Sequence, residues 1–228
     1  MSASRAAARI LELRLFLHGV RPPIWRRVLV PTEASVADLH EIIQIAMNWQ
    51  NAHLHRFHIR GRDYGVHYHG GIAFADDARA VRLGDLGLRS RDRFVYEYDL
   101  GDPWEHRIQL ERRVPAEPRK RYPQCTDGQR AGPPEDCGGV RAFMELRKTL
   151  ATHAAFVKRV GGRGDGEAER SWSDEDWDVL YSRREQHLIR QYGGFDPDRF
   201  RRGEVNRALQ QRFGTRCGVR ASGGGESR

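Results

Sequence analysis

Carboxylates and a histidine flank one tight turn near the middle of this 228-residue chain. Two stretches of alternating side chains are joined there by residues 101–103, Gly-Asp-Pro, which predicts a strand-turn-strand hairpin. If the hairpin closes at this turn, Asp99, Asp102 and His106 lie near one end of it. Carboxylate oxygens and imidazole nitrogens bind divalent metals and exchange protons. These three residues are therefore candidate metal ligands, and the alternative is a turn stabilised by aspartate side chains.

Histidines form a second group of candidates. His53 and His55 alternate along a predicted strand and could chelate a metal from one face, and His67 and His69 have the same spacing. No His-Glu-x-x-His motif or comparable helical spacing supports a metal site of known type. Such pairs also arise by chance in a chain with 10 histidines.

A proline-rich segment supplies further acidic residues and two thiols. Glu135, Asp136 and Cys137 follow a Pro-Pro pair, and Cys125 lies earlier in the same segment. The two cysteines belong to no Cys-x-x-Cys knuckle, which argues against half of a zinc site. We expect a rigid loop in which Asp136 caps the helix that follows.

A third candidate is a cluster of one indole and two guanidinium groups. Trp25, Arg26 and Arg27 are consecutive in a predicted strand and could grip phosphate or stack on a base. In the alternative, Trp25 belongs to the core and the arginines pair with Asp99 or Glu135.

The elements that must position these residues follow from hydrophobic periodicity. Alternating leucines predict a first strand, a capping box at Ser35 precedes a helical repeat, and later segments return to the period of two. We expect strands over 10–18, 24–30, 54–60, 64–68, 93–100 and 104–111, a helical turn over 81–88, and helices over 36–49, 139–160, 173–192 and 203–213. This order predicts an α+β fold, with a mixed or antiparallel sheet, a β-grasp-like ββαββ core and C-terminal helices.

The same pattern predicts one domain with two terminal extensions. The expected parts are a disordered N-terminus (1–9), a single α+β domain (10–213) and a disordered tail (214–228). Within the domain we expect a sheet-rich core (10–113), a proline-rich surface loop in place of a strand (114–138) and a helical part (139–213) with a flexible insertion (161–170).

Composition narrows the class of protein. With 39% hydrophobic and 31% charged residues, the chain resembles ordinary soluble proteins. The net charge of +8 is spread evenly and includes no basic block, so it is weak evidence for nucleic acid. No apolar stretch is long enough to span a membrane, and 3 cysteines suit a reducing compartment. We expect a cytoplasmic protein.

Several motifs together resemble one family. They are Pro22-Pro-Ile-Trp-Arg-Arg27, Asp38-Leu-His40 with Gln44 and Ala46-Met47, Trp49, His53-Leu-His55, Tyr96 to His106 and Pro133 to Gly139. Over about residues 10–213 the chain resembles the Ri-plasmid open-reading-frame-three-like family, also met as an insertion-element passenger protein with a recombinase-like label. The resemblance implies a compact α+β fold from mobile elements and chromosomes, with no reaction attached. The chain departs from the family at Asn48, where glycine is common, and at Gly132, where cysteine is common.

Two functions from different classes follow. The first is an accessory module of this mobile-element-associated family that binds a partner protein or nucleic acid through Trp25, Arg26, Arg27 and the hairpin surface, which includes Trp104. The second is a metal-dependent hydrolase with a divalent metal as cofactor. Its ligands would be drawn from Asp99, Asp102, Asp136, His53, His55 and His106, which must then converge in one cleft.

Overall fold

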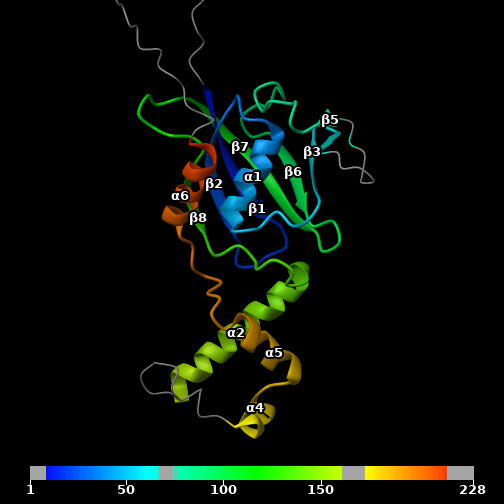
Figure 1. Cartoon of the computed structure of the whole chain (residues 1–228), viewed down its shortest axis with the longest axis vertical. Coiled ribbons are helices and arrows are strands. Elements are labelled where there is room, and N and C mark those ends of the chain that lie inside the picture. Colours follow the sequence, from blue (N-terminus) through cyan, green and yellow to red (C-terminus); the bar gives the residue numbers. More distant parts are fainter. Residues whose placement is uncertain (1–8, 67–73, 75, 161–172, 215–228) are drawn as a thin grey trace, which may run out of the picture.

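A computed structural model describes residues 9–66, 74, 76–160 and 173–214. Within these residues the strands form one mixed sheet in the order β5-β4-β3-β6-β7-β1-β2-β8 (Figure 1). The described pairs are antiparallel except β4 with β5. The strands are β1 (Arg9–Leu17), β2 (Trp25–Pro31), β3 (His55–Ile59), β4 (Arg62–Gly65), β5 (Asp76–Asp77), β6 (Arg93–Tyr98), β7 (Trp104–Pro115) and β8 (Gln124–Gln129).

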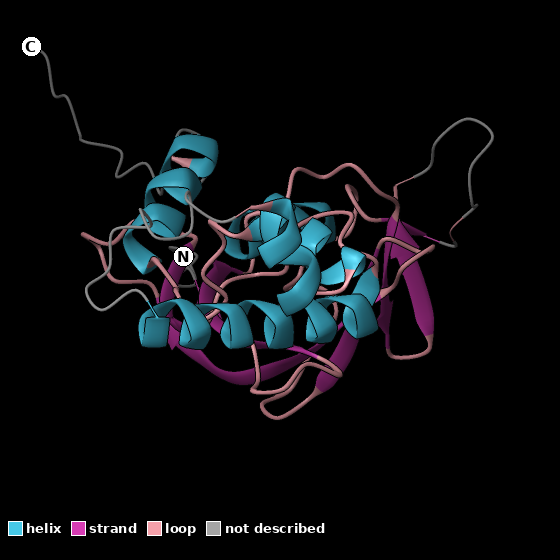
Figure 2. Ribbon diagram, turned by 90° about the horizontal axis from the view of Figure 1, so that it is seen from below, coloured by secondary structure: helices cyan, strands magenta, loops and turns pink. Residues whose placement is uncertain are grey.

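Helices cover one side of this sheet (Figure 2). The helices are α1 (Val36–Met47), α2 (Gly139–Val160), α4 (Asp174–Leu180), α5 (Arg183–Tyr192) and α6 (Arg202–Phe213). The predicted α+β class, with a helix packed on a mixed sheet after an N-terminal hairpin, is confirmed. Within the described residues, no helix has the length and apolar character needed to cross a membrane.

The capping box predicted at Ser35 begins α1. Ser35 accepts a hydrogen bond from the Asp38 amide, and the Asp38 carboxylate accepts one from the Ser35 amide, which is a complete capping box. The helix ends at Asn48, whose φ of 62° is left-handed. Asparagine tolerates this conformation nearly as well as glycine, so the departure from the family at this position preserves the helix end.

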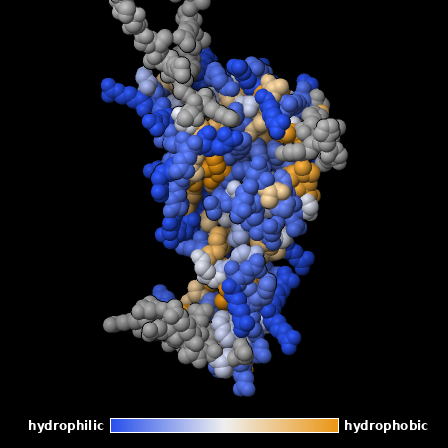
Figure 3. Space-filling model, viewed as in Figure 1, coloured by the Kyte–Doolittle hydropathy of each residue, from blue (hydrophilic) through white to orange (hydrophobic). Residues whose placement is uncertain are grey.

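The main core lies between the sheet and the helices. The predicted alternation in β1 holds, because the leucines at 11, 13, 15 and 17 are all buried. They pack with α1, with the first half of α2 and with Leu209 and Phe213 of α6. The surface seen in Figure 3 is largely hydrophilic, which agrees with an apolar interior closed by these helices.

The prediction of a loop without strands over 114–138 is wrong. β7 continues to Pro115, and β8 pairs with β2 at the edge of the sheet. The Asn206 side chain of α6 accepts a hydrogen bond from the Cys125 amide (2.7 Å) and donates one to the Cys125 carbonyl (2.9 Å). These distant partners hold β8 as a strand although its own sequence shows no period of two.

Helices α2, α4 and α5 form an arm below the sheet in Figure 1, whereas α6 lies beside β2 and β8. The single helix predicted over 173–192 is wrong, because Ser182 starts α5 with a capping box to Glu185 and so separates it from α4. Trp177, Tyr181 and Ile189 make a small core of the arm. The predicted flexible insertion lies outside the described residues, as do the tail except Gly214, which ends α6, and the N-terminal extension except Arg9, which belongs to β1.

Candidate metal centre

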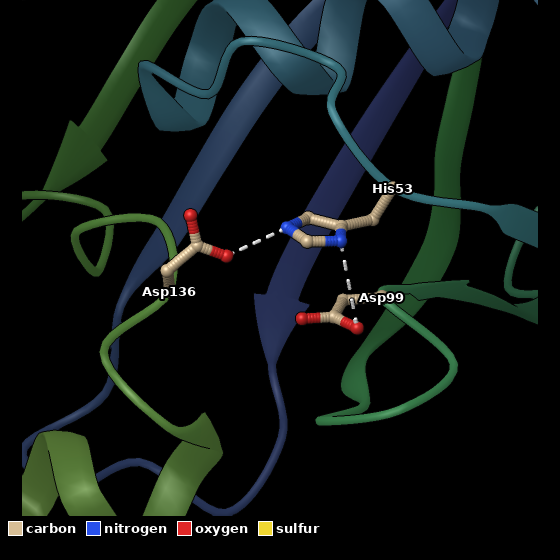
Figure 4. Close-up of side chains that lie close together, drawn as sticks. All are labelled: His53, Asp99 and Asp136. Atoms are coloured by element: carbon tan, nitrogen blue, oxygen red, sulfur yellow. Dashed lines mark hydrogen bonds and ion pairs between the residues drawn. The ribbon is translucent and has the colours of Figure 1, made fainter.

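The imidazole of His53 lies between two carboxylates (Figure 4). Its Nε2 is 2.8 Å from Asp136 Oδ1 and its Nδ1 is 3.9 Å from Asp99 Oδ1. One ligand atom from each residue lies within 4.8 Å of the others. The exposed fraction of the side chain is 15% for Asp99, 30% for His53 and 73% for Asp136. The cluster is therefore anchored on the Asp99 side and open to solvent on the Asp136 side.

Unusual backbone conformations place both aspartates. Asp99, just after β6, has a φ of 59°, and Asp136 has a φ of 58°. Asp99 Oδ1 also accepts hydrogen bonds from the amides of Gly101 and Asp102, both at 3.2 Å. This is the aspartate-stabilised turn that the sequence offered as an alternative to a metal site. The structure contains the turn, and the same carboxylate also faces His53.

A tyrosine hydroxyl joins the segments that carry the cluster. Tyr98 donates to the Glu135 carboxylate and accepts from the amides of Ala52 (2.9 Å) and His53 (3.4 Å). Glu135 also accepts from the Gln50 amide at 2.7 Å. Burial, together with the Glu135 carboxylate, raises the pKa of Tyr98 well above its usual value, so the hydroxyl stays protonated. The backbone of His53 is thus tied to the loop that bears Asp136.

Trp49 fixes the other end of that loop. Its indole Nε1 donates to the Pro133 carbonyl (2.9 Å), and its ring stacks on Tyr98 with centroids 4.8 Å apart. A Cβ atom at Gly132 would collide with the Met47 carbonyl oxygen. Glycine at this departure from the family therefore permits the close approach of the loop to α1.

His55 does not join His53, contrary to the predicted chelating pair. β3 begins at His55, whose buried ring stacks on His40 with centroids 3.4 Å apart. His40 is hydrogen-bonded to the Tyr96 hydroxyl (2.8 Å) and to Asn51 (2.7 Å). Burial lowers the pKa of His40 to about 4 and of His55 to about 3, so both rings are neutral at pH 7. The pair at positions 67 and 69 lies outside the described residues.

Of the three predicted hairpin ligands, only Asp99 belongs to the cluster. His106 pairs with Tyr96 across the hairpin and is fully buried, and burial lowers its pKa to about 3. The alternation of β7 turns Trp104 and His106 into the core, away from the turn. Asp102 contributes its amide to Asp99, and its side chain lies beside Gly139.

The predicted binding surface at Trp25, Arg26 and Arg27 does not form. Arg26 is 1% exposed and donates to the carbonyls of Trp25, Ala46 and Gln129. Burial lowers the pKa of Arg26 to about 10, so its guanidinium remains charged.

The alternative prediction for this cluster holds in part. Trp25 is buried, as that alternative predicted. Neither arginine pairs with Asp99 or Glu135 in the described structure; Arg27 binds Glu111 instead (2.6 Å).

The two described thiols serve no common site. Cys125 lies in β8, and burial raises its pKa to about 11; burial likewise raises the pKa of Cys137 to about 12.

Asp136 was expected to cap α2, but among the described contacts its carboxylate is hydrogen-bonded to His53. The segment 133–138 is a loop, and its acidic side chains contact His53 through Asp136 and Tyr98 through Glu135.

Tyr98 lies within the motif Tyr96 to His106, but sequence reasoning missed the contacts of its hydroxyl. A buried tyrosine usually finds a hydrogen-bond partner, so its position on the core face next to the turn was the available signal. The N–H group of the Trp49 indole also needs an acceptor when it is buried, and this was a second available signal.

Comparison with known proteins agrees with the fold and its motifs. The profile of the family described as plasmid pRiA4b ORF-3-like protein matches residues 9–201. This chain belongs to that family. The matched residues include His53, Asp99 and Asp136 and end just before α6.

Two relatives in this comparison carry no assigned function. The chain is 37% identical over 151 residues to the uncharacterized protein y4hQ of Sinorhizobium fredii, covering 64% of this chain and 76% of that protein. It is also similar to the crystal structure of the protein of unknown function MM3350 from Methanosarcina mazei Go1. The TM-score is 0.67 at 28% identity, covering 88% of this chain and 99% of the other. The likeness supports the α+β fold of this family member. Its chemistry must be argued from the residues of the site.

Proposed function

We propose that this family member binds one divalent metal ion through His53, Asp99 and Asp136 and uses it in hydrolysis. The observation that carries the proposal is the convergence of one imidazole and two carboxylates from three separate segments, with ligand atoms within 4.8 Å of one another. One nitrogen and two oxygens suit ions such as Zn²⁺ and Mn²⁺.

The geometry requires one ligand to move. Ligand atoms about 2.1 Å from an ion lie about 3 Å apart, whereas His53 now presents a different nitrogen to each carboxylate. Asp136 is the side chain to move, because it is 73% exposed and its only described hydrogen bond is to His53. Asp99, held by two turn amides, is the fixed ligand.

Three protein ligands leave coordination positions for water or substrate. A divalent ion lowers the pKa of its bound water and polarises carbonyl or phosphoryl oxygens, which is the basis for assigning hydrolysis as the reaction class. Tyr98 and Glu135 are positioning residues in this proposal, because they hold the His53 backbone and the loop of Asp136.

Calorimetric titration with Zn²⁺ and with Mn²⁺ tests metal binding. We expect one ion per chain for the native protein and at least tenfold weaker binding for Asp99→Asn. Asparagine tolerates a positive φ and can still accept the turn hydrogen bonds, so this variant removes charge with little change in fold. His58→Ala is the matched control, because His58 contacts a single carboxylate, Asp63, at the surface (2.7 Å).

Equal affinity in Asp99→Asn and the native protein would overturn the site. The reaction is tested separately, by release of p-nitrophenol from acetate and phosphate esters with added metal. Turnover should require the ion and disappear in Asp99→Asn; metal binding without any turnover would refute hydrolysis of these esters and leave the binding site standing.

A further inference from the structure

A cleft of about 470 Å³ lies between the 18–23 loop and the end of the sheet. It shares no residue with the metal cluster. Phe16 and Pro23 supply the apolar side chains that remain accessible along it, above the buried core residues Leu17, Val20 and Ile108. The cleft can therefore take up an apolar group.

The rim of this cleft is cationic. Arg21, Arg93 and Arg107 line it, and no aspartate or glutamate is among the described residues that do. Arg107 is neutralised by Glu105 at 2.9 Å. The side chains of Arg21 and Arg93 have no hydrogen bond or ion pair with any described residue, whereas most of the other arginines on this face of the sheet are paired.

Strand pairing sets the spacing of these groups. Arg107 of β7 lies opposite Phe16 of β1 and opposite Val95 of β6, and Arg93 lies opposite Gln109, two residues along β7. Diagonal neighbours on one face of a sheet are about 7–8 Å apart, so Arg93 lies beside Arg107 on this face, and Arg21 of the 18–23 loop lines the same cleft.

The loop over the cleft is held in place. The amides of Leu17 and His18 donate to the carbonyls of Ile24 (3.0 Å) and Glu105 (2.8 Å). Arg130 donates to the Pro23 carbonyl at 2.9 Å. Pockets formed in advance bind small ligands at a low ordering cost, so these contacts favour a ligand site over a closed turn.

From the apolar lining and the unpaired arginines, we propose that this cleft binds a small organic anion with an apolar body, such as an aromatic carboxylate or sulfonate. The guanidinium groups of Arg21 and Arg93 bind the anionic group, and the apolar residues receive the ring. The site is independent of the proposed metal centre.

The probe is 8-anilinonaphthalene-1-sulfonate, an aromatic sulfonate whose fluorescence rises in apolar surroundings, and N-phenyl-1-naphthylamine is its uncharged counterpart. Titrations would compare the native chain with Arg93→Gln, Arg21→Gln and the control Arg79→Gln. All three arginines are exposed, so each variant should fold. Circular dichroism would check this before titration.

We expect the sulfonate to bind about threefold to tenfold more weakly to Arg93→Gln and to Arg21→Gln, and with unchanged affinity to Arg79→Gln. The uncharged probe should bind all four proteins more weakly than the sulfonate binds the native chain. Equal sulfonate affinity in Arg93→Gln, Arg21→Gln and Arg79→Gln would overturn the proposal, as would equal affinity of the native chain for both probes.

Discussion

The Tyr98 hydroxyl donates a hydrogen bond to the Glu135 carboxylate and so joins the end of β6 to the loop before α2. The two residues are 37 positions apart, yet this contact brings the segments of Asp99 and Asp136 to either side of His53. The relative positions of the three candidate ligands therefore depend on this hydrogen bond.

Replacing Tyr98 by phenylalanine should destabilise the protein by about 1–3 kcal/mol, because the Glu135 carboxylate and the Ala52 amide lose their partner in a partly buried place. Urea denaturation measures the change. Tyr64→Phe is the control, since Tyr64 is buried and its hydroxyl has no hydrogen bond to a described residue. Equal losses in the two variants would show that the Tyr98 hydroxyl contributes nothing specific. A double-mutant cycle with Glu135→Gln isolates the pair.

Saturating Zn²⁺ or Mn²⁺ should raise the midpoint of thermal unfolding. A ligand at 100 times its Kd that binds only the folded state adds about 2.7 kcal/mol of stability. Asp136→Asn should abolish most of the increase, and Asp63→Asn, at the surface His58 pair, should retain it. A midpoint that rises by the same amount in both variants would place the ion elsewhere.

The unfolding free energy should fall as the pH is lowered from 6.5 toward 4. Burial lowers the pKa of His40 to about 4 and of His55 and His106 to about 3, below the ordinary value of 6.5. In this window the unfolded chain binds more protons, so acid favours unfolding; full stability is present above pH 6.5. Each buried histidine contributes a slope of about 1.4 kcal/mol per pH unit.

Urea titrations at several pH values measure that slope. His106→Leu should reduce it by about 1.4 kcal/mol per pH unit. Leu110→Val, at a buried position of the same strand that carries no titrating group, should leave it unchanged. An unfolding free energy that stays flat between pH 6.5 and 4.5 would contradict burial of the three rings in their neutral form.

Asn206→Ala should loosen the edge of the sheet. It removes both hydrogen bonds to the backbone of Cys125, and we expect a loss of about 1–3 kcal/mol in urea denaturation. The freed edge of β8 should also promote association, measurable by sedimentation velocity. Gln211→Ala, on the exposed side of α6, is the control. No difference between the two variants would mean that α6 does not protect β8.

The sequence by itself determined those elements whose stability comes from their own periodicity and caps. The alternating leucines of β1 and the capping box at Ser35 are local signals, and both predicted their elements correctly. Ser182 and Glu185 also formed a local signal, which divides two helices that periodicity alone had merged. His53, Asp99 and Asp136 were recognised from residue type alone, because imidazole and carboxylate are ligand chemistries wherever they lie.

Only the tertiary structure decided which candidates meet. Alternation along β7 sends His106 into the core, whereas a left-handed backbone at Asp99 and Asp136 turns their carboxylates toward His53. β8 likewise exists because β2 and Asn206 supply its hydrogen bonds. Contacts between residues so far apart in the chain arise from packing and long-range pairing, and no local pattern in the sequence encodes them.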